Sequence, residues 1–163
     1  MNLHLEGKVA MITGPAKGMG AAIARAFATE GCRLALVGRD TGAIARLAEP
    51  LETDGTQAQV LACDLTDAAQ CDAAIAAAAA AHFGCIDILV NVAGGSGPTG
   101  KTGAETTPEE FHEIVTLNMN GCFHMMRAVV PGMRRQGGGK IVNVGGTFGM
   151  RGRGGRMAHS TSK

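Results

Sequence analysis

The chain of 163 residues contains no tryptophan and no tyrosine. A phenol hydroxyl is therefore excluded as a catalytic group within this sequence. Long apolar segments are missing as well, since no run approaches the ~18 residues that span a membrane. Residues 1–6 lack the basic and apolar regions of a secretory signal. We therefore expect a cytoplasmic protein with no membrane partner.

An excess of charge of one sign is also missing, because 15 lysines and arginines stand against 14 aspartates and glutamates. This balance offers no basic face to nucleic acid, so we expect a small molecule or a protein as the partner. The five cysteines are odd in number, lie far apart and form no C-x-x-C pair, which argues against a disulfide framework and a zinc site. None of the histidines shows metal-ligand spacing. We expect reduced, mostly buried thiols and no metal site.

Short apolar segments bounded by turn residues alternate with longer segments of helical period, which is typical of βαβ units and a mostly parallel sheet. The predicted strands are residues 8–12, 33–37, 57–63, 86–91 and 140–144. Each is apolar enough to be buried on both faces. The fold class that follows is α/β: a three-layer Rossmann fold with a doubly wound parallel sheet, in one domain covering residues 1–163.

Helices are predicted between the strands. Their ranges are 18–30, 41–53, 67–83, 108–135 and from 157 onward. The clearest start lies at Thr107, an N-cap followed by a proline and the glutamate of a capping box. The last range holds only the opening turns of its helix, so we expect a truncated chain, the N-terminal two-thirds of a longer single-domain protein. A polypeptide that ended at Lys163 would be poorly stable and would assemble weakly.

A glycine turn, T-G-P-A-K-G-M-G at 13–20, follows the first predicted strand and opens the first helix. Gly14 permits the tight turn, Gly18 lets the backbone approach a pyrophosphate, and Gly20 lets the helix pack closely. The helix N-terminus favours the anion. The sequence therefore predicts a dinucleotide site here. Its expected contacts are Thr13, Gly14, Lys17, Gly18, Met19 and Gly20.

The pattern T-G-x-x-x-G-x-G resembles that of the short-chain dehydrogenase/reductase family, and further matches follow in the family's order across essentially the whole chain. Asp64, followed by Leu65, resembles the aspartate that binds the adenine amino group. The segment N-V-A-G resembles the family's N-N-A-G, with Val92 in place of the second asparagine. The cofactor contacts that this segment implies are Asn91, Ala93 and Gly94.

Two more matches lie near the expected reaction centre. Asn118 resembles the family asparagine that orders a proton-relay water, and Lys163 falls at the active-site lysine, which also holds the cofactor ribose. The family's serine and tyrosine are absent: counting back from Lys163 places His159 at the tyrosine position and Gly146 at the serine position.

Coenzyme choice depends on the residues after the second strand, where an acid binds a ribose hydroxyl and a base accepts a 2′-phosphate. Gly38 occupies the usual acid position, and Arg39 follows it. Arg39, with Lys17 as a second cation, favours NADP(H) over NAD(H). The alternative is that Arg39 is solvated or stacks on adenine while Asp40 only caps the second helix.

Three accounts of the altered site remain open. In the first, His159 takes over proton transfer, and Thr147 or Ser160 supplies the missing hydroxyl. In the second, redox chemistry is lost and the protein is a non-catalytic nucleotide-binding sensor, scaffold or inactive subunit. In the third, Gly146 and His159 are changes introduced into an ordinary enzyme. A histidine without any role is a further alternative.

The resemblance implies an NAD(P)(H)-dependent oxidoreductase that interconverts an alcohol with a ketone or aldehyde. Arg151, Arg153 and Arg156 lie in the segment that flanks the substrate in this family, so an anionic substrate is one hypothesis and a solvated loop is the other. Segment 95–100 is expected to form a mobile loop over the cofactor. The resemblance also implies a homodimer or homotetramer built on residues 108–135 and the helix begun at Met157.

Overall fold

The computed structural model describes residues 3–163, apart from the side chains of residues 81 and 82. Its centre is one sheet of five parallel strands in the order β3-β2-β1-β4-β5. The strands are β1 (Val9–Thr13), β2 (Arg33–Gly38), β3 (Ala58–Ala62), β4 (Ile88–Asn91) and β5 (Lys140–Asn143). The chain starts in the middle, winds outward to β3, and returns to build β4 and β5 on the other side. The predicted doubly wound parallel sheet is confirmed.

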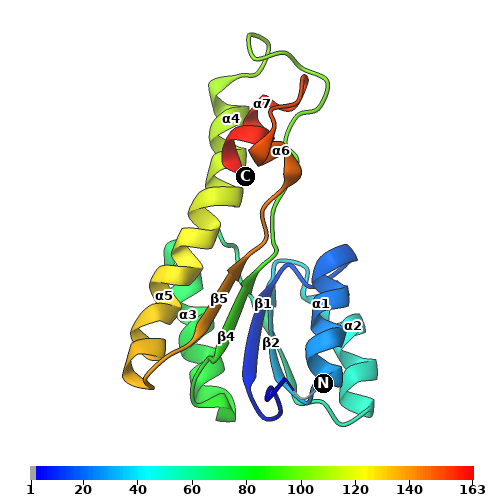
Figure 1. The fold of residues 1–163 in the computed structure, drawn as a ribbon, viewed down its shortest axis with the longest axis vertical. Helices are drawn as coiled ribbons and strands as arrows, with labels where there is room; N and C mark the ends of the chain where they lie inside the picture. The colour runs from blue at the N-terminus through cyan, green and yellow to red at the C-terminus, as the bar shows by residue number, and fades with distance from the viewer. Residues whose placement is uncertain (1–2) are drawn as a thin grey trace.

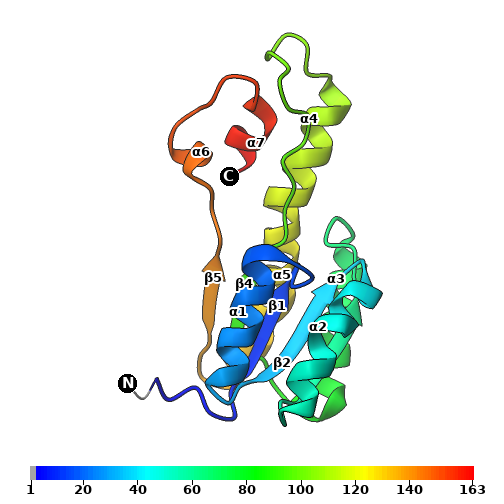
Figure 2. The same ribbon diagram turned by 90° about the vertical axis from the view of Figure 1, so that its right-hand side faces the viewer.

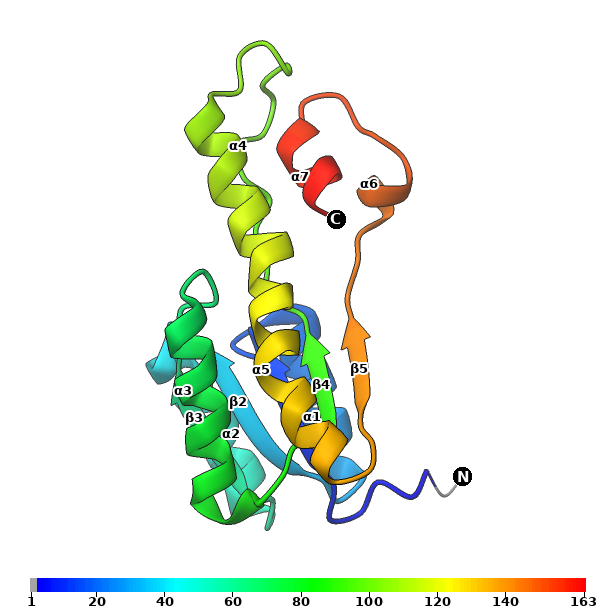
Figure 3. The same ribbon diagram turned by 90° about the vertical axis from the view of Figure 1, so that its left-hand side faces the viewer.

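Helices cover both faces of this sheet, which makes the three layers visible in Figures 1, 2 and 3. One face carries α1 (Gly18–Thr29) and α2 (Thr41–Thr53), and the other carries α3 (Ala68–Ala78) and α5 (Gly121–Arg135). Alternate strand residues divide between the two layers because successive side chains point to opposite faces. In β1, Met11 packs toward α3 and α5, whereas Ile12 packs toward α1 and α2.

Local capping explains where most helices begin. Asp40 accepts a hydrogen bond from the Ala43 N–H at the start of α2, and Asp67 caps α3 in the same way. Thr107 and Glu110 form the predicted capping box at the start of α4 (Pro108–Val115). The N-terminus of α1 has no side-chain cap. Its first N–H groups therefore remain available to a ligand.

One predicted helix ends in a π turn, and another is interrupted by one. The range 67–83 divides into α3 and η1 (Ala79–Phe83), and the range 108–135 divides into α4, η2 (Thr116–Asn120) and α5. The second forms the long rod that extends past the sheet in Figure 1. Propensity and apolar spacing do not separate a π turn from the α-helix around it, and such turns often mark functional positions.

The prediction that every strand is buried on both faces is wrong for the two edge strands: in β3 only Leu61 is buried, and β5 is more exposed still. Lys140, Val142 and Asn143 are exposed, because β5 lies at the edge of the sheet and pairs with β4 alone in the described part of the chain. Beyond β5 the chain forms an unpredicted short helix, α6 (Thr147–Met150), and then α7 (Met157–Ser162). Figures 2 and 3 show α7 beside α4 and α6 on the other side of α7, both away from the sheet. None of the described helices is long and apolar enough to cross a membrane.

Candidate functional site

A pocket of about 370 Å³ lies at the carboxyl ends of β1 to β4. This edge is where the winding of the sheet reverses, the position at which open α/β sheets bind ligands. The pocket contains most of the predicted cofactor contacts. Its lining residues are Gly14, Ala16, Lys17, Met19, Gly20, Gly38, Arg39, Cys63, Asp64, Leu65, Val92, Ala93, Gly94 and Leu117.

The three glycines of the turn meet different constraints. A Cβ atom on Gly20 would collide with the Gly14 carbonyl oxygen, and one on Gly14 would lie 2.8 Å from the Cα of Ala93. These two glycines allow the turn to pack against α1 and the β4 loop. Gly18, at φ +55°, has nothing within 4 Å of an added Cβ, so this backbone faces open space. The turn is a cradle of bare backbone at the uncapped start of α1.

Both positively and negatively charged side chains line the pocket. Arg39 and Lys17 are exposed cations on its rim, whereas Asp40 is used as the α2 cap. Asp64 follows β3, and its carboxylate accepts hydrogen bonds from the N–H and the hydroxyl of Thr66. These bonds, with Arg39 nearby, hold the pKa of Asp64 below its ordinary value. Asp64 therefore presents an ionised acceptor.

Two of the predicted contacts lie behind the pocket. Thr13 is fully buried, and its hydroxyl accepts from the N–H groups of Val92 and Ala93. Asn91 is also buried and donates to the Asn143 side chain at 2.8 Å. In this geometry both residues hold the β4 loop that forms the pocket wall.

The predicted reactive residues meet above this wall, around Gly94 and Gly95. A Cβ on Gly94 would lie 2.7 Å from Asn118 Oδ1 and 2.8 Å from Lys163 Nζ. Asn118 is buried on η2 and clasps Gly95: its Oδ1 accepts from the Gly95 N–H, and its Nδ2 donates to the Gly95 carbonyl. The structure thus brings Asn118 and Lys163 together beside the pocket, although they are 45 residues apart in sequence.

His159 joins the same group from α7. Its Nδ1 lies 3.0 Å from the Gly95 carbonyl oxygen. A carbonyl only accepts, so Nδ1 carries the hydrogen and Nε2 is the nitrogen left to exchange a proton. A Cβ on Gly146 would lie 3.7 Å from this Nε2. Gly146 and His159, the two positions that the sequence comparison predicted for the family's serine and tyrosine, therefore face each other, with room for a side chain at Gly146.

Sequence reasoning missed Ser162. This buried side chain accepts from Asn118 Nδ2 at 2.8 Å and donates to the His159 carbonyl oxygen at 3.1 Å. It ties α7 to η2, and its place beside Lys163 was the only signal that could have identified it. Thr147 instead lies exposed at the start of α6, and the Ser160 hydroxyl is buried without a hydrogen-bond partner among the described residues.

The arginines after β5 lie at the outer side of this group. The Arg153 guanidinium stacks over the Phe148 ring at 5.1 Å, and that ring meets His159 edge-on at 6.1 Å between centroids. Arg151 is exposed. The predicted glycine-rich loop is fastened at its end, because the Gly100 N–H donates to the carbonyl of Gly155.

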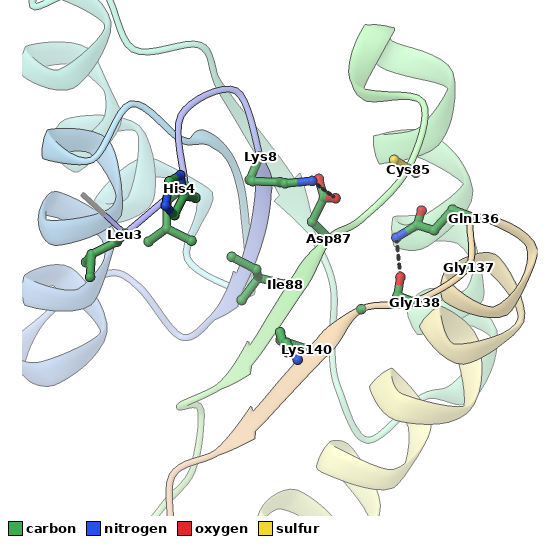
Figure 4. A pocket seen from close by; sticks show the side chains of 12 residues that line it. Leu3, His4, Lys8, Cys85, Asp87, Ile88, Gln136, Gly137, Gly138 and Lys140 are labelled. Atoms are coloured by element: carbon green, nitrogen blue, oxygen red, sulfur yellow. Dashed lines mark hydrogen bonds and ion pairs between the residues drawn. The ribbon is translucent and has the colours of Figure 1, made fainter. Parts of the chain in front are cut away.

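A larger hollow of about 720 Å³ lies at the opposite, amino-terminal edge of the sheet. Figure 4 shows Lys8 and Asp87 turned toward each other there, and Gln136 turned toward Gly138. Lys8 and Asp87 form an ion pair of 3.2 Å, and the Gln136 side chain donates to the Gly138 carbonyl at 2.8 Å. These polar groups are therefore bonded to one another. No group of three or more candidate metal ligands occurs among the described residues, here or elsewhere. The polar groups that converge on open space are those of the carboxyl edge.

Comparison with known proteins gives a consistent result. The family described as short chain dehydrogenase matches residues 8–163. D-threitol dehydrogenase of Mycolicibacterium smegmatis is 43% identical over 143 residues, which is 88% of this chain and 54% of that protein. The chain therefore spans about half the length of this relative.

Solved structures agree with the fold. An NAD+-bound xylitol dehydrogenase superposes with a TM-score of 0.93 at 30% identity, over 98% of this chain and 60% of that one. An actinorhodin polyketide ketoreductase with NADPH superposes with a TM-score of 0.89 at 31% identity, over 96% of this chain and 59% of that one. The predicted family resemblance and the Rossmann fold are confirmed.

Proposed function

Because this chain belongs to the short-chain dehydrogenase/reductase family, we propose that it is the nucleotide-binding part of an NAD(P)(H)-dependent oxidoreductase that interconverts an alcohol with a ketone or aldehyde. The observation that carries the proposal is the convergence of Asn118, His159 and Lys163 on Gly94 and Gly95, at the mouth of the glycine-lined pocket. When bound, the nicotinamide ring supplies or accepts the hydride.

The pocket fits a dinucleotide. The bare backbone at Gly18 and the free N–H groups at the uncapped start of α1 suit a pyrophosphate. Asp64 offers an ionised acceptor to the adenine amino group from the end of β3. Relatives with bound NAD+ and with bound NADPH share the fold, which supports a nicotinamide cofactor of either kind.

Our proposal favours NADP(H) over NAD(H). No acidic side chain follows β2 at the ribose position, since Gly38 stands there and Asp40 is committed to capping α2. Arg39 and Lys17, both on the pocket rim, can pair with a 2′-phosphate from two sides.

His159 is proposed as the group that exchanges the substrate proton. The Gly95 carbonyl fixes one ring nitrogen and leaves Nε2 directed toward Gly146. Asn118 and Ser162 act as positioning residues, because they hold Gly95 and α7 in place. Lys163 is proposed to hold the cofactor ribose beside Gly94. The empty space at Gly146 is where the family's serine hydroxyl would hold the substrate oxygen.

The experiment that tests this proposal is single-turnover hydride transfer. The protein is loaded with NADPH or NADH and mixed with a panel of ketones and aldehydes, acids included, while the loss of reduced-cofactor absorbance is followed. His159→Ala, His159→Tyr and the pair Gly146→Ser with His159→Tyr are measured alongside. The expected result is turnover that Ala abolishes and Tyr preserves or raises.

A different outcome would favour the second account of the site. Cofactor binding without turnover in the unmodified protein, with turnover restored only by the double variant, would identify a non-catalytic nucleotide-binding protein. The observation that favours a non-catalytic protein is that Gly146 has no hydroxyl to hold a substrate oxygen.

The substrate arginines and the assembly are tested separately. An anionic substrate is proposed because Arg153 stacks on Phe148, whose ring contacts His159, and because Arg151 is exposed in the same segment. An unchanged KM after replacement of Arg151, Arg153 and Arg156 by alanine would contradict it.

A homodimer or homotetramer, and a cytoplasmic location, are proposed from the family resemblance. Light scattering of the full-length protein measures the assembly directly.

A further inference from the structure

Two buried cysteines lie in contact beside the nucleotide pocket. Cys63 follows β3, and Cys71 lies in the first turns of α3. Their sulfur atoms are 3.8 Å apart and share a hydrogen bond. This is the one such cysteine pair that the described residues contain, since Cys32 donates instead to the Leu5 carbonyl. Neither thiol has a part in the function proposed above.

Both residues are buried, Cys63 at 2% and Cys71 at 0% exposure, but Cys63 is also among the residues that line the pocket of about 370 Å³. A small oxidant in the pocket therefore lies nearer to Cys63 than to Cys71. Cys71 stands directly behind it, where a resolving thiol is required.

The pKa shifts of the two thiols also favour Cys63 as the cysteine that reacts first. The hydrogen bond between the two thiols lowers the pKa of Cys63, against the opposing effects of burial and of the carboxylates of Asp64 and Asp67. The same contact, together with burial, raises the pKa of Cys71. Cys63 is thus the better thiolate and Cys71 the better proton donor.

We infer that Cys63 and Cys71 form a reversible disulfide when a peroxide reaches the empty nucleotide pocket, and that bound nucleotide opposes its formation. The Cys63 sulfur attacks one peroxide oxygen, the O–O bond breaks, and a sulfenic acid and one water are formed. The Cys71 sulfur then attacks the Cys63 sulfur, the S–O bond breaks, and the hydroxyl leaves with the Cys71 proton as a second water. Two electrons pass from the thiols to the peroxide.

The bond would alter the wall of the pocket. The sulfur atoms must approach by about 1.7 Å to reach the ~2.05 Å of a disulfide. Cys71 now donates to the carbonyl oxygen of Leu65, which also lies 2.9 Å from His124 Nδ1. Loss of the first contact loosens the turn that carries Asp64 and Leu65, both of which line the pocket. Oxidation and nucleotide binding are therefore expected to oppose each other.

The effect of nucleotide rests on the proposed function, so the experiment measures the bond and the binding separately. Reduced protein is treated with hydrogen peroxide alone, with NADP+ and with NAD+. Intact mass follows the loss of two hydrogens, about 2 Da, per disulfide. Trypsin cannot separate the cysteines, since no lysine or arginine lies between them. A protease that cuts before Asp64 and Asp67 yields separate peptides that only the disulfide joins.

The variants Cys63→Ala and Cys71→Ala are compared with Cys85→Ala, a half-buried cysteine on the opposite edge of the sheet. We expect the unmodified protein and Cys85→Ala to form the link and to lose it with dithiothreitol. Cys71→Ala should stop at a Cys63 sulfenic acid that dimedone traps, and Cys63→Ala should leave Cys71 unreacted. Circular dichroism before and after oxidation checks that each protein stays folded.

Binding supplies the second readout. We expect oxidised protein to bind NADP+ about tenfold more weakly, which corresponds to a reduction potential about 30 mV higher in saturating nucleotide. Absence of the Cys63–Cys71 link in folded, reacted protein overturns the inference. Equal oxidation with and without a nucleotide that is shown to be bound overturns its second half. A protein that forms the link but binds no nucleotide contradicts the proposed function and leaves the disulfide established.

Discussion

The lower part of the molecule, formed by the sheet and the glycine turn, contrasts with the upper part formed by α4, α6 and α7. In the lower part, β1 and most of β2 are fully buried, and the turn is built from backbone packed against backbone. In the upper part only a few side chains are buried, among them Ile114, Asn118, Ala158 and Ser162, and Met150 of α6 is 89% exposed. Figure 1 shows the two parts joined by the rod of α4, η2 and α5.

This difference indicates what each part can tolerate. The glycine turn is made of backbone, so a side chain added at Gly14 or Gly20 would meet its neighbours. A site made of side chains on short helices can change its chemistry by single substitutions, and Gly146 and His159 both lie in this upper part.

The largest expected loss of NADPH affinity comes from adding a side chain inside the glycine turn. Gly20→Ala places a methyl group against the Gly14 carbonyl oxygen, so the turn must shift. We expect an overpacking cost of about 1–3 kcal/mol in unfolding free energy. NADPH affinity should fall at least tenfold, measured by fluorescence titration. Gly42→Ala in α2 is the matched control, because its added Cβ meets nothing closer than 3.6 Å and alanine favours the helix. Equal NADPH affinity in the two variants would contradict the account.

A smaller effect is expected from removing the hydrogen bonds of Asn118 to Gly95 and Ser162. Asn118→Ala leaves the Gly95 N–H and the Ser162 hydroxyl without their buried partner. The expected loss of unfolding free energy is about 2 kcal/mol, measured in urea. Turnover should fall through kcat, because α7 and His159 lose their anchor, while nucleotide affinity changes little. Asn120→Ala, two residues away at the end of η2, serves as the control. Equal destabilisation by both variants would show that these hydrogen bonds are unimportant.

Coenzyme preference gives a third test, confined to the lower part. Arg39→Ala removes a rim cation proposed to pair with the 2′-phosphate. We expect NADPH affinity to fall about tenfold, since a hydrogen bond to a charged group contributes ~1.5–3 kcal/mol. NADH affinity should stay unchanged. Arg46→Ala, in α2, controls for the loss of one positive charge. A parallel loss for both coenzymes would indicate that Arg39 contacts adenine instead.

The smallest effect concerns acid stability. Hydrogen bonds hold the pKa of Asp67 below its ordinary value of 3.8: the Gln70 backbone N–H and side chain donate to it, as does the Ala69 N–H. A lowered native pKa stabilises the fold above the ordinary value, and this stabilisation disappears as the pH falls through the native pKa. Asp67→Asn keeps a cap without the charge. Urea midpoints should differ between the two proteins at pH 6, and the difference should shrink as the pH falls below 3.8. A constant difference across this range would be the opposing result.

Sequence reasoning predicted the parts that depend on short-range physics. The glycine turn, the Thr107 capping box and the doubly wound parallel sheet all follow from local residue types and their alternation along the chain. The contacts around Gly95 could not be predicted, because they depend on where the π turn of η2 directs Asn118. The approach of Cys71 to Cys63 depends on how α3 packs on β3. Sequence spacing does not determine either arrangement.

The measurement that tests the separation of the two parts most directly is NADPH affinity alongside turnover in the single variants His159→Ala and His159→Tyr. The account predicts NADPH affinities within twofold of the unmodified protein, because the pocket at the glycine turn does not depend on the side chain at position 159. It predicts turnover rates that differ at least a hundredfold between the two variants, since positioned proton transfer contributes ~10²–10⁴. Affinity that falls together with turnover would contradict the account and make His159 part of the nucleotide site.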